Sequence, residues 1–96
     1  RLFMVPGRGH CGGGPGANQF GGYCDPSVVD ADHDMMQALE RWVEQGVAPD
    51  KIIATNYVGG RPDKGIAFQR PLCPFPQVAH YDGKGDPKDA KSFSCR

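Results

Sequence analysis

The sequence has no long apolar run and no excess charge of either sign. No stretch approaches the roughly 20 apolar residues that a membrane-spanning helix needs, so no membrane span is expected. The 96 residues carry 11 basic and 11 acidic side chains. This balance gives no electrostatic reason to expect nucleic acid or an anionic membrane as a partner. A chain of 96 residues forms one small domain at most. Few residues are available for a hydrophobic core, because hydrophobic residues make up only 39% of the sequence.

Glycine and proline are abundant instead, with 14 glycines and nine prolines, as is typical of loop-rich chains. Many of them gather in residues 6–16, PGRGHCGGGPG, directly after the apolar residues 1–5. Glycine costs about 1 kcal/mol and proline about 3 kcal/mol per helical residue, so this segment cannot form a helix. We predict a strand over residues 1–5, covered on both faces, followed by a long irregular loop that presents His10 and Cys11.

The clearest predicted element is an amphipathic helix that begins near Asp30 or Asp32 and ends near Gln45. Either aspartate can cap its first turn, and Gly46 can end it in the left-handed conformation. Its apolar residues fall at helical spacing and predict one buried stripe, with Trp42 as a core anchor. The stripe consists of Met35, Ala38, Leu39, Trp42 and Val43.

After the helix, the sequence predicts short strands and an irregular extended segment. Residues 51–58 and 66–70 predict the two strands of a hairpin, separated by a glycine-containing turn. The alternating prolines of residues 71–76 require an extended, irregular chain. Residues 77–81 predict a further short strand.

The four cysteines favour an oxidising compartment, because thiols in the cytosol are kept reduced. Four thiols allow three full pairings, and their spacing does not choose among them. The chain starts with Arg1 and enters an apolar run at once, without the regions of a signal peptide. We therefore expect it to be cut from the body of a larger protein.

The glycine spacing of residues 7–12 matches the GxGxxG fingerprint of dinucleotide-binding loops. That fingerprint needs a helix to begin at the glycines, so that the phosphates meet the helix N-terminus. Residues 13–15, Gly-Gly-Pro, oppose such a helix. Nucleotide binding is therefore a disfavoured alternative.

Two other kinds of chemistry can use the His10 imidazole. A zinc ion could be held by His10, Cys11, Cys24 and His33, although these gaps do not resemble the usual paired spacings. A histidine just past a core strand is also where an α/β-hydrolase places its general base, which takes a proton from serine and returns it to the leaving group. An ordinary loop histidine is the alternative to both.

Several stretches resemble the tannase and feruloyl esterase family, to which the hydrolase of mono(hydroxyethyl) terephthalate is also similar. They are residues 1–16 (RLFMVPGRGHCGGGPG), 42–50 (WVEQGVAPD), 70–79 (RPLCPFPQVA), 83–86 (GKGD) and 93–95 (FSC). The stretches are long and unusual, and they cover nearly the whole chain in the right order. The resemblance implies a secreted or periplasmic serine carboxylic ester hydrolase with an α/β-hydrolase core and a large inserted lid domain.

By this resemblance, residues 1–96 are the C-terminal portion of the α/β-hydrolase catalytic domain. They comprise the last core strand, the histidine loop, one amphipathic helix, a short hairpin and a disulfide-stapled tail. His10 is then the catalytic base, and Cys11 is bonded to a cysteine beside the nucleophile, outside this chain. Cys73 and Cys95 correspond to the family's C-terminal disulfide. The lid, the nucleophilic serine and the catalytic acid belong to the upstream part of the same enzyme, which is the expected partner.

The resemblance also sets the expected chemistry. The substrate is a small ester of an aromatic acid, cleaved through an acyl-enzyme, and its identity depends on the absent lid. No cofactor is expected in this chain, although a structural calcium ion in the lid is compatible with the resemblance. Arg8 departs from the methionine expected at that position, and Cys24 has no implied partner. The alternative from another class is a non-enzymatic, disulfide-stapled binding or structural fragment.

Overall fold

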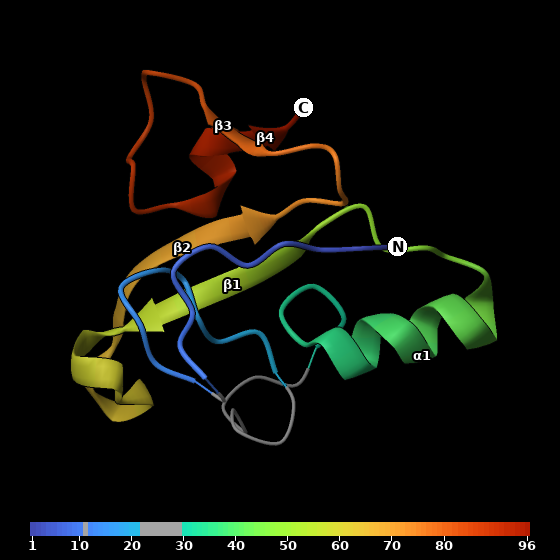
Figure 1. The fold of residues 1–96 in the computed structure, drawn as a ribbon, viewed down its shortest axis with the longest axis horizontal. Coiled ribbons are helices and arrows are strands. Elements are labelled where there is room, and N and C mark those ends of the chain that lie inside the picture. Colours follow the sequence, from blue (N-terminus) through green and yellow to red (C-terminus); the bar gives the residue numbers. More distant parts are fainter. Residues whose placement is uncertain (11, 22–29) are drawn as a thin grey trace.

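The computed structural model describes residues 1–10, 12–21 and 30–96 of the chain (Figure 1). An antiparallel hairpin of strands β1 (Ile52–Tyr57) and β2 (Ile66–Leu72) lies at the centre. Helix α1 (Met35–Gln45) and the glycine-rich segment lie below β1 in this view, and a small C-terminal unit lies above β2. The hairpin therefore separates the glycine-rich segment from the C-terminal unit.

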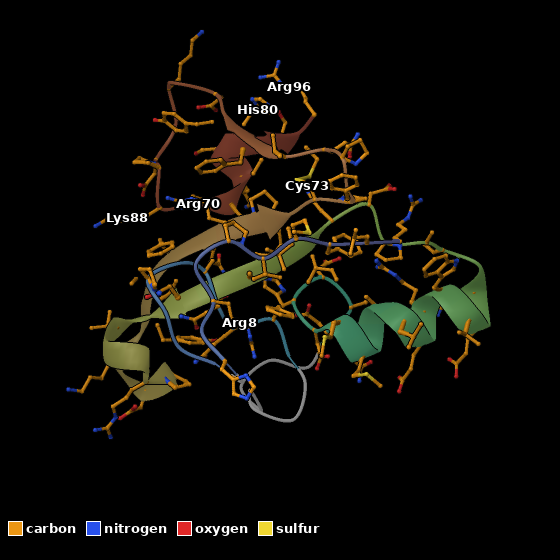
Figure 2. All side chains as sticks on the ribbon, viewed as in Figure 1. Arg8, Arg70, Cys73, His80, Lys88 and Arg96 are labelled. Atoms are coloured by element: carbon orange, nitrogen blue, oxygen red, sulfur yellow. A yellow bond between two sulfur atoms is a disulfide. The ribbon has the colours of Figure 1, made fainter. Side chains whose placement is uncertain are left out.

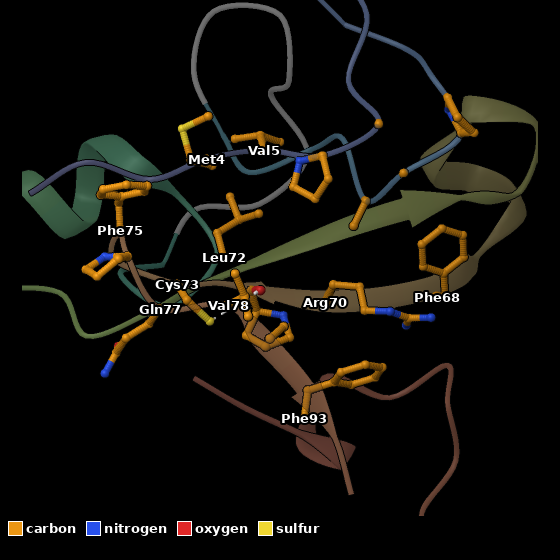
Figure 3. A pocket seen from close by; sticks show the side chains of 18 residues that line it. Met4, Val5, Phe68, Arg70, Leu72, Cys73, Phe75, Gln77, Val78 and Phe93 are labelled. Carbon is orange, nitrogen blue, oxygen red and sulfur yellow. Dashed lines mark hydrogen bonds between the residues drawn. The ribbon is translucent and has the colours of Figure 1, made fainter. Parts of the chain in front are cut away.

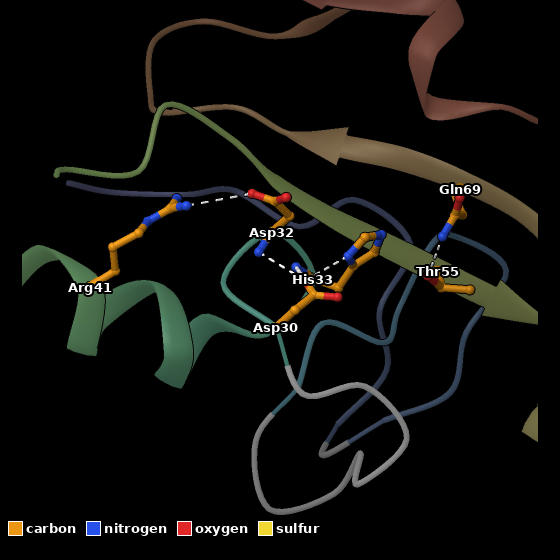
Figure 4. A network of polar contacts seen from close by, with 6 residues as sticks. All are labelled: Asp30, Asp32, His33, Arg41, Thr55 and Gln69. Carbon is orange, nitrogen blue, oxygen red and sulfur yellow. Dashed lines mark hydrogen bonds and ion pairs between the residues drawn. The ribbon is translucent and has the colours of Figure 1, made fainter.

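The predicted hairpin is confirmed. Its register runs from Ile52 opposite Leu72 to Tyr57 opposite Ile66. The Gln69 amide donates a hydrogen bond of 3.1 Å to the hydroxyl of the fully buried Thr55, which joins the two strands through side chains (Figure 4). Strand β2 continues past residue 70 because proline is accepted in an edge strand. The 3₁₀ turns of the chain are Val58–Gly60, Pro62–Lys64 and Ala90–Ser92.

Helix α1 is capped at both ends. Asp34 accepts a hydrogen bond of 2.8 Å from the backbone N–H of Met36, and Gly46 ends the helix with φ of 70°. The predicted Gly46 cap is confirmed, but the predicted start near Asp30 or Asp32 is wrong. Asp30 instead accepts from the backbone N–H groups two and three residues further on, which forms a separate turn before the helix. No helix among the described residues is long and apolar enough to cross a membrane.

The apolar stripe of α1 does not face the core of this chain. Only Ala38 is buried, and the half-buried Gln37 and Arg41 lie on the same side of the helix. Leu39 and Trp42 are exposed. The predicted burial is therefore confirmed for Ala38 and wrong for the other four residues of the stripe, which are exposed among the described residues.

The N-terminal segment, residues 1–5, is extended but is not a strand of either sheet. It makes one bridge, between Phe3 and Pro74, and the carbonyl of Leu2 accepts a hydrogen bond of 2.7 Å from Phe75. Phe3 and Val5 pack against the core, whereas Leu2 and Met4 are exposed. The predicted strand with two covered faces is wrong within the described residues, because they cover only one face.

The core is thin. Its buried residues are Ala17, Ala38, Ile52, Ala54 and Leu72, flanked by the partly buried Phe3, Val5, Phe20 and Phe68. Three of the five buried residues are alanines, which bury little apolar area and gain correspondingly little from the hydrophobic effect. Other constraints must therefore contribute to holding the segments together.

The C-terminal unit consists of β3 (Ala79–Tyr81) paired antiparallel with β4 (Phe93–Cys95). The strand at 79–81 falls in the predicted run 77–81, whereas β4 was not predicted. A disulfide joins Cys73 to Cys95, as the resemblance implies. The Arg70 guanidinium lies 4.9 Å from the Phe68 ring and 4.5 Å from the Phe93 ring, so it connects β2 to β4 (Figure 3). The N–H of Gln69 on β2 also donates a hydrogen bond of 2.9 Å to the carbonyl of Lys88, so a disulfide, a stacked cation and a backbone hydrogen bond hold this unit beside the hairpin.

We predict that replacing both half-cystines, Cys73→Ala with Cys95→Ala, lowers the free energy of unfolding by about 3 kcal/mol. The bond closes a loop with a sequence separation of 22 residues, which restricts the unfolded chain. Urea titration followed by circular dichroism measures the change. Ser94→Ala, an exposed position on β4, is the control and should shift the midpoint little. Equal midpoints for the double variant and the control would contradict the prediction.

Candidate functional site

The glycine-rich segment, residues 6–16, forms a closed loop that presents His10. The N–H of Gly9 donates to the carbonyl of Gly13, and the N–H of Gly16 donates to the carbonyl of Gly7, both at 2.9 Å. The first closure lies inside the second, and His10 lies within the smaller one, at the exposed tip of the loop. The prediction of an irregular loop that presents His10 is confirmed; Cys11 lies outside the described residues.

Glycine is required where the two arms of the loop meet. A Cβ atom on Gly14 would lie 2.2 Å from the Gly7 carbonyl oxygen, and one on Gly16 would lie 2.2 Å from the Pro6 carbonyl oxygen. Gly14 also has φ of +103°, which side chains other than glycine rarely adopt. No helix begins in residues 12–21, so the helix that a dinucleotide fingerprint needs is absent there.

Two asparagine side chains fix this loop to its surroundings. The buried Asn18 donates a hydrogen bond of 2.9 Å to the carbonyl of Gly14, and Asn56 on β1 donates one of 2.7 Å to the carbonyl of Gly16. Gln19 and Thr55 also exchange backbone hydrogen bonds of 2.8 and 3.0 Å. The loop is thereby held on the edge of β1 that is opposite to β2.

Arg8 joins the loop to the start of α1. Its guanidinium donates a hydrogen bond to the carbonyl of Asn18 and lies 4.7 Å from the centre of the Phe20 ring. The carbonyl of Phe20 in turn accepts from the N–H of Met35, the first residue of α1. Figure 2 shows Arg8 below β1, on the opposite side from Arg70 and Cys73. No local sequence pattern indicates these contacts, so the positioning roles of Arg8, Asn18 and Asn56 were not predicted.

His10 has no hydrogen-bond partner among the described residues. Ser92 and Ser94 belong to the C-terminal unit, which Figure 1 shows at the opposite end of the molecule from the glycine-rich loop. Ser27 lies outside the described residues. The part of the chain that the structure describes therefore brings no serine to His10.

The aspartates before α1 have structural partners. Asp30 Oδ1 lies 2.8 Å from His33 Nδ1, and the hydrogen bond from His33 holds the pKa of Asp30 below its usual value (Figure 4). Asp32 forms an ion pair of 3.7 Å with Arg41, and Asp34 caps the helix. This acidic cluster is therefore a set of turn, ion-pair and cap contacts around the helix start, and Asp34 is the cap instead of the predicted Asp30 or Asp32.

The remaining candidate ligands do not form a metal site in the described residues. There, no three His, Cys, Asp or Glu side chains come together in a way that could hold a metal ion. Of the four residues in the zinc alternative, Cys11 and Cys24 lie outside the described residues, and His33 pairs with Asp30.

An apolar groove of about 810 Å³ lies between the N-terminal segment, β2 and the C-terminal unit (Figure 3). Its lining includes Met4, Leu72, Phe75, Val78 and Phe93, with Arg70 as its charged member. His10 is not among the lining residues. The base of the histidine loop, at Pro6, Gly7, Pro15 and Gly16, therefore lines the groove, whereas the imidazole at its tip does not.

The comparison with protein families finds one match that spans residues 1–96, to the family described as tannase and feruloyl esterase. The chain is 48% identical over 97 residues to an uncharacterised esterase of Xanthomonas campestris and covers 17% of that protein. It is 44% identical over 96 residues to the mono(2-hydroxyethyl) terephthalate hydrolase of Piscinibacter sakaiensis and covers 13% of it. In both cases the match includes 99% of this chain.

The fold is also similar to solved structures. The crystal structure of feruloyl esterase B from Aspergillus oryzae matches 98% of this chain with a TM-score of 0.80 and 26% identity. A second esterase structure from the same organism matches 94% of the chain with a TM-score of 0.78. The chain covers 18% of each of these proteins, so it spans less than a fifth of the length of the relatives that it matches.

We predict that Gly16→Ala destabilises the chain by about 2 kcal/mol, because the new methyl group must displace the Pro6 carbonyl. Gly12→Ala in the same loop is the matched control, since a Cβ at Gly12 meets nothing within 4 Å and this glycine has no positive φ. Thermal unfolding of the two variants measures the difference. Amide exchange at Gly9 and Gly16 should accelerate only in Gly16→Ala, and equal behaviour of the two variants would contradict the described closure.

Proposed function

The chain belongs to the tannase and feruloyl esterase family, and we propose that it carries the catalytic histidine of a serine carboxylic ester hydrolase. In this proposal residues 1–96 are the C-terminal portion of an α/β-hydrolase domain, and His10 is the general base. The observation that carries the proposal is the setting of His10, an exposed imidazole at the tip of a closed loop. An imidazole in this setting can meet a hydroxyl supplied by another segment.

The proposed reaction has two stages. A serine from the preceding part of the enzyme attacks the ester carbonyl while His10 removes the hydroxyl proton, and the protonated imidazole then gives that proton to the leaving alcohol. The acyl group stays on the serine as an acyl-enzyme. His10 next takes a proton from water, which attacks the acyl-enzyme and releases the carboxylic acid. The catalytic acid that orients His10 also belongs to the preceding part.

The rigidity of the loop supports a role in proton transfer. A general base must lie within about 2.6–3.2 Å of the proton donor to accept its proton. The two backbone closures and the side chains of Asn18, Asn56 and Arg8 fix the backbone on both sides of His10. We propose that Cys11 adds a covalent tie to a cysteine beside the nucleophile.

The compartment and the cofactor requirement complete the proposal. The Cys73–Cys95 disulfide supports an oxidising location, and we propose that the enzyme is secreted or periplasmic. We propose no cofactor in this chain, and a structural calcium ion would belong to the lid. This lid also lies in the preceding part of the polypeptide.

The relatives support an aromatic acid in the substrate. One is named as a hydrolase of mono(2-hydroxyethyl) terephthalate and others as feruloyl esterases, and both names denote esters of aromatic carboxylic acids. We propose an ester of this class for the whole enzyme. The choice among such acids depends on the lid, so these residues favour no single one.

The first prediction of the proposal concerns His10. In the full-length enzyme, His10→Ala should lower kcat for an aromatic ester by roughly 10⁴-fold or more, because the nucleophile loses its base. The His10 side chain is exposed, so the thermal stability should change little. His80→Ala, another exposed histidine on β3, is the control and should keep the activity. An enzyme that retains a tenth of its kcat without His10 would contradict the assignment.

The second prediction concerns the chain alone. The isolated 96 residues should release no aromatic acid from an ester above the rate in buffer, because the proposed nucleophile lies outside them. Chromatographic detection of the acid measures this. Hydrolysis by the isolated chain that disappears in His10→Ala would overturn the proposed division of the active site. Full-length enzyme that hydrolyses no ester would instead favour the non-enzymatic alternative.

A further inference from the structure

One face of α1 is apolar and exposed. We call it the outer face, and it consists of Met35, Met36, Leu39, Trp42 and Val43, whose exposed fractions are 40%, 50%, 48%, 38% and 77%. At 3.6 residues per turn these side chains fall within a sector of about 120°. The contacts of α1 with the rest of the chain lie on another side, at Ala38, where only 1% of the surface is exposed.

Such a face is unusual for a soluble protein. An amphipathic helix normally turns its apolar stripe toward a core, and a contiguous exposed apolar patch marks an interaction surface. Here the side that faces the core cluster is formed by Ala38, with the half-buried Gln37 and Arg41 beside it. The helix therefore has a second, larger apolar surface that the described residues leave uncovered.

The size of the face limits what can cover it. A helix of 11 residues is about 16 Å long and, with side chains, about 10 Å wide, so one face offers a few hundred Å² at most. A stable complex between separate proteins buries about 800 Å² on each partner. The outer face is therefore too small to hold a second copy of this chain by itself. This minimum area does not apply to a segment of the same polypeptide, because covalent linkage makes the local concentration of that segment high.

The comparisons show that the relatives have additional polypeptide that could supply that segment. The relatives share this fold over nearly all of the chain, but the chain covers only 13–18% of their length. Resting on the proposed function, we propose that the outer face of α1 is an internal interface, against which the part of the polypeptide that precedes Arg1 packs with an apolar surface.

This interface also connects to the active-site loop. The N–H of Met35, at the start of α1, donates a hydrogen bond of 2.9 Å to the carbonyl of Phe20. The guanidinium of Arg8 stacks on the Phe20 ring, and Arg8 is two residues before His10 in the sequence. Packing on the outer face therefore fixes the end of α1 to which the histidine loop is attached, and it places His10 relative to the segment that supplies the nucleophile.

The test measures accessibility in the full-length enzyme, with cysteine introduced at Leu39→Cys on the outer face. Glu40→Cys is the matched control, because Glu40 is adjacent to Leu39, exposed and not a member of the outer face. The maleimide labelling rate at position 39 should be at least 100-fold lower than at position 40 in the native enzyme and equal to it in urea. Equal rates in the native enzyme would overturn the proposal.

A second pair of variants covers the case in which a cysteine disturbs the native disulfides. Val43→Arg should lower the melting temperature of the full-length enzyme by about 5 °C or more, whereas Glu44→Arg should leave it nearly unchanged. Equal melting temperatures would overturn the proposal.

Protection of Leu39→Cys that disappears as a dimer dissociates on dilution would assign the face to a second copy and would also overturn the proposal. Labelling needs no ester hydrolysis, so inactive enzyme with a protected position 39 would refute the proposed function alone.

Discussion

The close approach of two backbone segments, residues 6–7 and 14–16, is the constraint on which the rest of the structure depends. The amide nitrogen of Gly16 lies 2.9 Å from the Gly7 oxygen, and side chains at Gly14 or Gly16 would collide with carbonyl oxygens. Because these arms touch through backbone alone, the Gly16 carbonyl stays available for the amide of Asn56. The loop and the hairpin thereby become one unit, and the position of His10 follows from the position of β1.

The elements that could be predicted are those with a complete local signal. The hairpin was predicted from the strand-like pattern of its two runs, and the end of α1 was predicted from one glycine, Gly46. Both predictions are confirmed. The helix start was mispredicted because aspartates at 30, 32 and 34 can each cap, and only the packing selects Asp34. Strand β4 was missed because its three residues gain their structure from pairing with β3 and from the disulfide. The N-terminal segment has a strand-like pattern, but the described residues cover only one of its two faces.

The candidate site was predicted unevenly for a similar reason. Composition identified the loop and its exposed histidine, because glycine and proline exclude regular structure locally. The contacts that fix this loop come from side chains up to 40 residues away, as with Asn56 and Gly16, and no short pattern encodes them. Arg8 departs from the expected methionine, yet it joins Asn18 to the Phe20 ring, a role that only the fold reveals. The Cys73–Cys95 pairing came from family resemblance, since spacing alone left three pairings open.

The thin core and the exposed helix face have one physical origin. Ala17 and Ala54 let the end of the loop and β1 approach closely, and Ala38 is the one buried residue of α1. Close approach gives the backbone and asparagine hydrogen bonds their short distances, but it leaves little apolar area inside the chain. The larger apolar side chains of α1 are on its other side, where the described residues leave them exposed. Short-range backbone geometry therefore fixes how the imidazole is presented, whereas in our proposal the surface of α1 positions the whole loop against the segment that supplies the nucleophile.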